Sequence, residues 1–224
     1  ALRAIPFDSF LVLHADDAGA TFDEMTLQYA SGRAVDDIAL LKLNLFVRLW
    51  RKLGWTIEEV DRALRVFIPA NAPFKKSTLE LKPLKTALIY MAHLKTLDDM
   101  LALGDESRIK LLTLWSDIPI TGKNPLYAQL FLTGNSHHSD PAFDHPLGDY
   151  LSSNVPFLMD HLPALQGALG LTRDEIISIV EPMGRTFDGK LSRANVSSLY
   201  RYRLLARGLS MPVHALLELK WLSH

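Results

Sequence analysis

The sequence predicts an all-α fold, an irregular stack of αα-hairpins with one long loop-rich segment at about residues 116–156. Two observations predict it. Apolar residues recur at helical spacing along most of the chain. In addition, a glycine, an apolar residue and a hydroxyl cap follow a helical stretch in the same order at residues 53–60, 169–176 and 207–212. Because these glycines are irregularly spaced, they indicate recurrent helical hairpins and not a strict repeat.

Residues 36–64 predict a helix, a glycine stop and a second helix. Asp36 or Asp37 can cap the first turn. Gly54 can adopt the left-handed conformation that ends a helix, and Thr56 with Glu59 has the spacing of a capping box for the next helix. These signals place the first helix at about residues 38–53.

The apolar residues of this helix fall on two nearly opposite sides. One side carries Ile38, Leu41, Leu45 and Leu49, and the other carries Leu40, Leu43, Val47 and Trp50. Two apolar sides predict a helix packed between two layers of structure, with Trp55 at the corner before the second helix. We expect this architecture to depend on Leu41, Leu45, Leu49, Trp50, Gly54 and Trp55.

Similar signals predict the remaining elements. A capping box at Thr21–Glu24 opens a short helix through about Tyr29, and Thr96 caps a short helix that is separate from the one before it. Gly170 and Gly208 are expected to end helices as Gly54 does. The other expected helices are at about 84–94, 107–115, 157–169, 172–181, 193–206 and 211–222.

We expect residues 1–224 to form a single α-helical module cut from a longer chain. Within it, sub-lobes at 1–115 and 157–224 are conceivable, joined by the 116–156 segment. That segment is rich in proline and glycine, and long ordered loops are usually functional or lie at interfaces. A receptor- or partner-binding module that uses this segment is therefore one alternative function.

Composition excludes several classes of protein. The formal net charge is −1 at pH 7, which provides no field to attract nucleic acid or an anionic membrane. The chain has no cysteine, so disulfides, thiolate metal sites and thiol nucleophiles are excluded. No uncharged apolar run approaches the roughly 18 residues of a membrane-spanning helix.

The best candidate for chemistry is a histidine-rich loop. His137, His138 and His145, with Asp140 and Asp144, could gather around Zn²⁺ in a metal-dependent hydrolase. However, their spacing matches no metal-binding motif, and a polar surface loop is the favoured interpretation. The sequence also contains no nucleophile motif and no phosphate-binding glycine loop. We therefore assign no catalytic, cofactor-binding or metal-binding residues and expect no cofactor.

Two further hypotheses are weaker. Residues 165–180 and 200–217 have the outline of helix-turn-helix units, with Arg201, Arg203 and Arg207 on or near one of them. The presumed recognition helices are poor in basic and amide side chains, so a nucleic-acid partner is not expected. Four histidines between His137 and His161 could also sense pH at an interface. The Asn195–Ser197 glycosylation sequon falls within a predicted helix and is interpreted as coincidence.

Several segments, taken in order, carry a resemblance to a known family: LKLN at 41–44 with RLWRKLGWTIEEVD at 48–61, LTLWSDI at 112–118 with PLYAQLFL at 125–132, DPAF at 140–143, HLPALQGALGLTRDE at 161–175, and LYRYRLLARGL at 199–209. Together they resemble the helical region of the A components of bacterial insecticidal toxin complexes (Tc toxins), which are related to the Salmonella virulence-plasmid A proteins. The resemblance covers residues 36–222.

The resemblance implies a structural role and no catalysis. In that family the A component is a secreted homo-pentamer that binds the target cell and forms the channel through which a toxic enzyme is injected. The resembled region belongs to the outer shell around the channel. The expected partners are other segments or protomers of the same toxin, and, for the whole protein, the toxin B and C components and the host cell surface. This segment is not expected to insert into a membrane.

Overall fold

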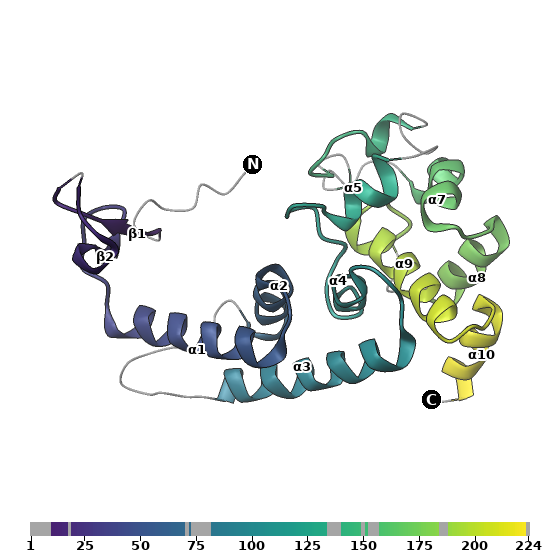
Figure 1. Ribbon diagram of the computed structural model, residues 1–224. Coiled ribbons are helices and arrows are strands. Elements are labelled where there is room, and N and C mark those ends of the chain that lie inside the picture. The colour runs from purple at the N-terminus through teal and green to yellow at the C-terminus, as the bar shows by residue number, and fades with distance from the viewer. Residues whose placement is uncertain are drawn as a thin grey trace. The chain divides into compact units, whose positions relative to one another are not determined.

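The structure is a computed structural model, and it describes residues 10–17, 19–69, 72, 82–133, 140–148, 151, 157–183 and 188–222. As predicted, the described chain is mostly helical (Figure 1). Its α-helices are α1 (Asp37–Leu53), α2 (Ile57–Phe67), α3 (Lys82–Leu101), α4 (Ser107–Leu112), α5 (Leu126–Phe131), α7 (Leu162–Leu169), α8 (Arg173–Met183), α9 (Arg193–Gly208) and α10 (Val213–Leu222). Short 3₁₀ helices lie at Phe22–Glu24 (η2), Pro141–Phe143 (η4) and Leu158–His161 (η5), and strands at Leu11–His14 (β1) and Thr26–Tyr29 (β2).

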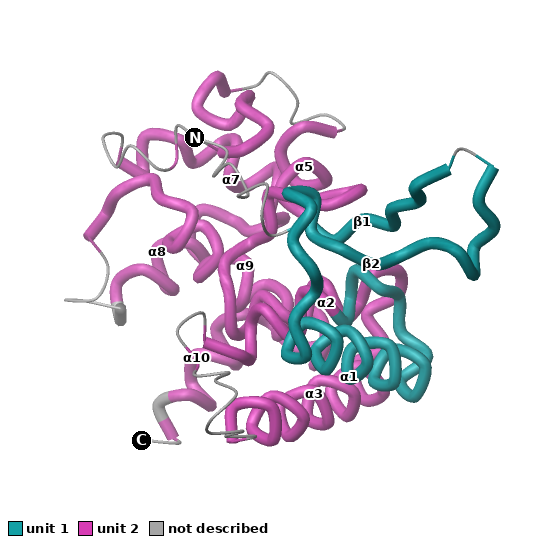
Figure 2. Tube along the Cα trace, turned by 90° about the vertical axis from the view of Figure 1, so that its left-hand side faces the viewer, with its two compact units in different colours: residues 1–60, 73–80 teal, residues 61–72, 81–224 magenta. Residues whose placement is uncertain are grey.

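The chain divides into two compact units (Figure 2). Unit 1 comprises residues 1–60 and 73–80, and unit 2 comprises residues 61–72 and 81–224. The boundary between them falls inside α2. Helices α3 and α4, which precede the 116–156 segment, and α7 to α10, which follow it, all belong to unit 2.

The N-terminal part of unit 1 is a β-hairpin, and the helix predicted through Tyr29 is wrong. The capping box itself forms, since the backbone N–H of Thr21 donates to the Glu24 carboxylate at 2.7 Å. The helical turn nevertheless ends at Glu24. Residues 26–29 pair antiparallel with residues 11–14, with Leu11 opposite Tyr29. A capping box satisfies the backbone hydrogen-bonding groups of only one helical turn. Pairing with the strand at residues 11–14 then decides the conformation of the residues that follow.

The predicted start and end of α1 and the predicted start of α2 are confirmed, whereas α2 continues to Phe67, three residues beyond the predicted end. The Asp36 carboxylate accepts a hydrogen bond from the Ala39 N–H at 2.8 Å, and Gly54 ends α1 with φ 66°. At the start of α2, the Thr56 N–H donates to Glu59 at 2.7 Å, and the Glu59 N–H donates to the Thr56 hydroxyl at 3.2 Å. Local capping chemistry therefore sets both ends of α1 and the start of α2.

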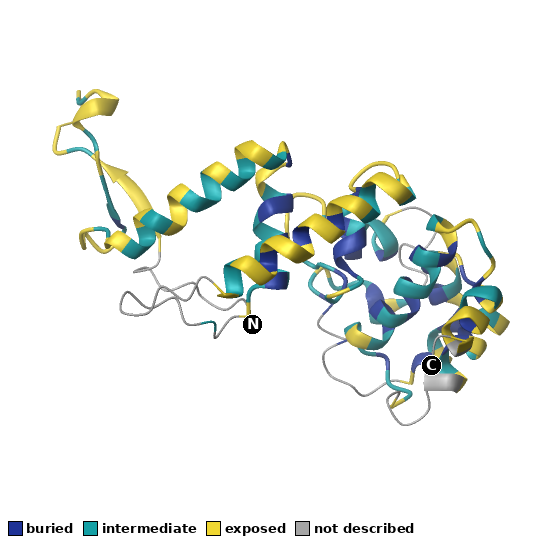
Figure 3. Cartoon of the chain, turned by 90° about the horizontal axis from the view of Figure 1, so that it is seen from below, coloured by how far each residue is buried: buried dark blue, intermediate teal, exposed yellow. Residues whose placement is uncertain are grey.

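The predicted packing of α1 between two layers is wrong for this chain. All of residues 37–53 are described, and none of them is buried (Figure 3). Leu40 and Leu43 are 47% and 43% exposed, whereas Trp55 at the corner is buried. The others expected to carry the packing, Leu41, Leu45, Leu49 and Trp50, are of intermediate exposure. Periodicity shows which sides of a helix can be covered, but not that the same chain supplies the cover.

Helix α3 is longer than predicted because Thr96 does not cap a new helix. Instead its hydroxyl donates to the Ala92 carbonyl at 3.1 Å, one turn earlier in a continuous helix. A threonine hydroxyl can make this bond inside a helix as readily as it caps one, so the residue type alone cannot separate the two cases. Ala102 and Gly104, both with positive φ, lie just beyond the end of the helix at Leu101.

The core of unit 2 is organised around α9, which packs against α7, α8 and α10. Its buried apolar residues include Val196, Leu199 and Leu204. The 116–156 segment contributes to this core wherever it is described, since α5 packs on α7. Its buried apolar side chains are those of Ile118, Leu126, Tyr127, Phe131, Phe143 and Leu151.

Of the two glycines expected to end C-terminal helices, Gly170 does so and Gly208 does not. Gly170 has φ 62° after α7, and the Thr172–Glu175 capping box starts α8 with an N–H to carboxylate bond of 2.8 Å, both as predicted. The prediction for Gly208 is wrong, because this residue is still part of α9. A Cβ at Gly208 would lie 3.3 Å from the side chains of Leu101 and Leu103. Gly208 therefore permits close packing, and the positive φ falls on Ser210.

Candidate functional site

Two of the five candidate residues of the proposed histidine-rich metal loop lie outside the described residues. His137 and His138 are among the residues that the structure does not describe. His145 is described, and its Nδ1 accepts a hydrogen bond from the Leu147 N–H at 3.2 Å. In the described part of the chain, no three His, Asp or Glu side chains gather in a group that could hold a metal ion.

The structure pairs Asp140 with His161, which the sequence analysis did not anticipate. The His161 Nδ1 lies 2.5 Å from the Asp140 Oδ2, and both side chains are 18% exposed. The other carboxylate oxygen accepts the Ala142 N–H at 3.0 Å and so caps η4. The pair therefore connects η4 to η5. The only local signal was Asp140 before Pro141, which is typical of a helix start.

An aromatic stack lies behind this pair. The rings of Phe131 and Phe143 stack at 4.5 Å, and His161 meets Phe143 edge-on at 6.1 Å. The Tyr127 hydroxyl donates to the Phe143 carbonyl at 3.0 Å, and burial raises the pKa of Tyr127 well above its ordinary value. These contacts are those of a packed core, so we interpret the Asp140–His161 pair as a structural connection.

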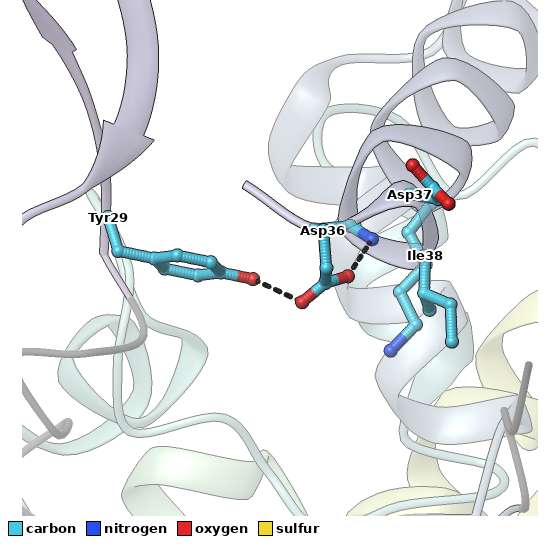
Figure 4. A pocket seen from close by; sticks show the side chains of 6 residues that line it. Tyr29, Asp36, Asp37 and Ile38 are labelled. Atoms are coloured by element: carbon cyan, nitrogen blue, oxygen red, sulfur yellow. Dashed lines mark hydrogen bonds between the residues drawn. The ribbon is translucent and has the colours of Figure 1, made fainter. Parts of the chain in front are cut away.

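A small acidic pocket of about 250 Å³ lies in unit 1 where the hairpin meets the start of α1 (Figure 4). The Tyr29 hydroxyl donates to Asp36 at 3.1 Å, and the Arg33 guanidinium lies 4.1 Å from the centre of the Tyr29 ring. Burial and this hydrogen bond raise the pKa of Tyr29, while the bond from the Ala39 N–H lowers the pKa of Asp36. The carboxylate thus caps α1 and fastens the hairpin to it.

Another opening lies in unit 2 and combines cationic side chains with apolar walls. We call it the arginine cleft. Its volume is about 300 Å³. It is lined by Arg62, Arg65, Val66, Ile109, Leu112, Ser116, Asp117, Ile118, Pro119, Ile120, Thr121 and Arg193. Guanidinium groups above apolar walls form a surface that can bind an organic anion. Sequence analysis missed this cleft because its residues come from three distant parts of the chain.

The arginines considered for nucleic-acid binding include one with a clear structural role. The Arg201 guanidinium donates to the carbonyls of Thr113 at 2.6 Å and Ser116 at 2.9 Å, which ties α9 to the residues after α4. An open groove of about 510 Å³ runs beside it between α9 and α10 and is lined mainly by Leu205, Leu216 and Leu219. The hydrogen bonds to the Thr113 and Ser116 carbonyls engage Arg201 within the fold.

The glycosylation sequon is engaged in the fold. The Asn195 side-chain amide donates to Asp188 and to the Lys190 carbonyl, each at 2.8 Å, and Ser197 is fully buried. An enzyme that glycosylates asparagine needs this amide to be accessible, so the geometry agrees with interpreting the sequon as coincidental.

Comparison with known proteins found no matching family model, no similar curated protein and no similar solved structure. The resemblance of residues 36–222 to toxin A components therefore stays a prediction. Within the described residues, no helix is both long enough and apolar enough to span a lipid bilayer.

Proposed function

We propose that this chain is a non-enzymatic structural and assembly module that resembles the outer shell of a Tc toxin A component. Two things support the proposal. Similar segments follow one another in the expected order over residues 36–222, and the described chain is mostly helical. In this proposal the α7–α8 and α9–α10 pairs are hairpins of a stack that neighbouring shell segments continue.

The observation that carries the proposal is the exposure of α1. This helix has 17 residues, is apolar on two sides and has no buried residue. Burying apolar surface stabilises a protein by about 25 cal/mol per Å², so a helix of this pattern gains little while uncovered. Exposed apolar surface of this kind marks protein–protein contacts. We infer that another polypeptide segment covers α1.

The proposed partners follow from the resemblance. They are other segments or protomers of the same toxin, arranged as a pentamer in the family, and, for the whole protein, the B and C components and the host cell surface. Export from the producing bacterium belongs to the same proposal. Arg201, one of the arginines that could have favoured nucleic acid, is held by backbone carbonyls of this chain.

Sedimentation velocity tests the assembly role. Over about 1–100 μM, which spans micromolar dissociation constants, we expect reversible association of this chain. The double variant Leu40→Glu/Leu43→Glu should abolish it, because both side chains are exposed on the same side of α1. The matched control is Asn44→Glu/Arg48→Gln, which changes the net charge equally but alters the polar side of the helix.

Circular dichroism should show that both variants keep the helical content of the parent. A chain that stays monomeric over the whole range, or a control that dissociates as completely as the α1 variant, would contradict an assembly role of this surface.

A further inference from the structure

We propose that the arginine cleft of unit 2 binds a small organic carboxylate with an apolar body. The apolar walls come from α2, α4 and the residues that follow α4, including Val66, Leu112 and Ile118. The cationic side chains come from α2 and from the first turn of α9. The proposal concerns a ligand site and is independent of the assembly role of α1.

The charges around the cleft are unevenly matched. The lining side chains in the described chain include three arginines and one aspartate. Arg65 pairs with Asp61 at 2.8 Å. The single lining aspartate, Asp117, is shared between Arg193 and Arg201. The cleft therefore keeps an excess of positive charge that an anion would neutralise.

Arg193 is the residue that points to a ligand. Its Nε lies 3.7 Å from the Asp117 Oδ2, and Arg201 Nη2 lies 3.6 Å from the other oxygen of the same carboxylate. Both distances are too long for hydrogen bonds. Within the described chain, the Nε of Arg193 is shielded from solvent and has no hydrogen-bond partner. The Arg193 side chain as a whole is 40% exposed, but a shielded N–H group without a hydrogen-bond partner is costly, which favours a bound acceptor at this position.

The geometry favours a monocarboxylate over other anions. A guanidinium presents parallel N–H groups that match the two oxygens of a carboxylate. Asp117 repels any anion at this place, but it would repel a phosphate dianion about twice as strongly as a monocarboxylate. The apolar walls and the volume of about 300 Å³ suit a body of a few carbon atoms, at the lower end of small-molecule sites.

The walls of the cleft are held in place before any ligand binds. The Ile118 N–H donates to the buried Ser197 hydroxyl at 2.9 Å, and Arg201 holds the carbonyls of Thr113 and Ser116. These bonds fix residues 113–118 against α9. A preorganised cleft loses less entropy on binding, which makes measurable affinity for a small ligand reasonable.

NMR of the arginine side chains provides the test, because the Nε–H of Arg193 is itself the expected donor. The purified chain is titrated with 4-methylpentanoate, with its neutral analogue 4-methylpentanamide, and with inorganic phosphate. We expect 4-methylpentanoate to shift the Arg193 Nε–H and the Ile118 methyl signals saturably below about 20 mM, since so small a ligand should bind in the millimolar range. The amide should cause no saturable shift.

Two variants separate the cleft from the rest of the surface. Arg193→Gln should weaken 4-methylpentanoate binding at least tenfold, measured on the Ile118 methyl group. Arg173→Gln, an exposed arginine of α8 outside the cleft, should leave binding unchanged. If Arg193→Gln does not fold, Arg65→Gln, whose side chain is 77% exposed, serves instead and should weaken binding at least threefold.

Three results would overturn the proposal. The first is the absence of a saturable shift with 4-methylpentanoate, and the second is equally tight binding of the amide or of phosphate. The third is that Arg193→Gln, or Arg65→Gln where it is used instead, binds 4-methylpentanoate as tightly as the parent.

Discussion

Replacing Ser197 by alanine tests whether the 113–121 segment is an integral part of unit 2. The Ser197 hydroxyl accepts the Ile118 N–H at 2.9 Å and donates to the Arg193 carbonyl at 2.6 Å. Ser197 is fully buried, and Ile118 is 1% exposed. In the variant, the Ile118 N–H would lose its partner in a place that water does not reach.

The expected cost follows from that lost bond. A buried donor left without a partner costs about 1–3 kcal/mol. The Arg193 carbonyl lies in the first turn of α9 and can still accept the helical bond, so it adds little. We therefore expect Ser197→Ala to reduce the free energy of unfolding of unit 2 by about 2 kcal/mol.

Hydrogen exchange of the α9 amides, followed by mass spectrometry, measures this free energy without assuming that both units unfold together. A loss of about 2 kcal/mol corresponds to exchange about 30-fold faster. The matched control is Ser198→Ala, next in sequence and only partly buried, whose hydroxyl donates to the Ala194 carbonyl at 3.0 Å. That variant should change stability by no more than about 0.5 kcal/mol. Acceleration below threefold, or equal effects of both variants, would refute the reasoning.

Three further predictions concern other parts of the chain. Burial raises the pKa of Tyr200 to about 12, so from about pH 10 the unfolded state releases the phenolic proton first. Stability should then fall by about 2–3 kcal/mol up to pH 12, and Tyr200→Phe should reduce this fall in unfolding followed by circular dichroism. In denaturant titration, Gly54→Ala should lower the free energy of unfolding by about 1–2 kcal/mol, because the φ of Gly54 is 66°. Gly54→Asn should lower it less, because asparagine tolerates this conformation. Phe131→Ala should lower the free energy of unfolding by about 3–5 kcal/mol, because the ring is 2% exposed and stacks on Phe143; a loss below about 1 kcal/mol in urea titration would show that the 116–156 segment is peripheral.

The prediction for Phe131 also changes how the partner-binding alternative can be tested. The described part of the 116–156 segment supplies Ile118, Tyr127 and Phe143 to the core of unit 2. Removing the whole segment should therefore unfold the unit and would not isolate a binding function. Point substitutions at exposed residues of the segment, such as Lys123, are the appropriate variants.

Helix boundaries were predictable wherever the determining contacts are local. The hydroxyl and carboxylate of Thr56 and Glu59 are three residues apart, and so are those of Thr172 and Glu175, and both capping boxes form. Thr21 and Glu24 form the same bonds, yet a strand follows them. The capping signal was correct in all three cases, whereas the extent of the element depended on residues far away in the chain.

The candidate sites were not predictable for the same reason. Asp140 and His161 are 21 residues apart, and the arginine cleft joins Arg62 and Arg193. Neither pair has a spacing that any single element would produce. Gly208 gives a further example, since its role is set by Leu101 and Leu103, which reach it from α3 and the residues just after it.

The amino-acid order alone was sufficient for the helical class, the composition-based exclusions and the caps of α1, α2 and α8, because these depend on residue type and on interactions within one helical turn. The three-dimensional arrangement was needed to learn that no residue of α1 is buried, that residues 11–29 form a hairpin, and that arginines from α2 and α9 meet at one cleft. Those features depend on which surfaces meet, and an apolar stripe or a charged side chain has the same local pattern whether or not a partner covers it.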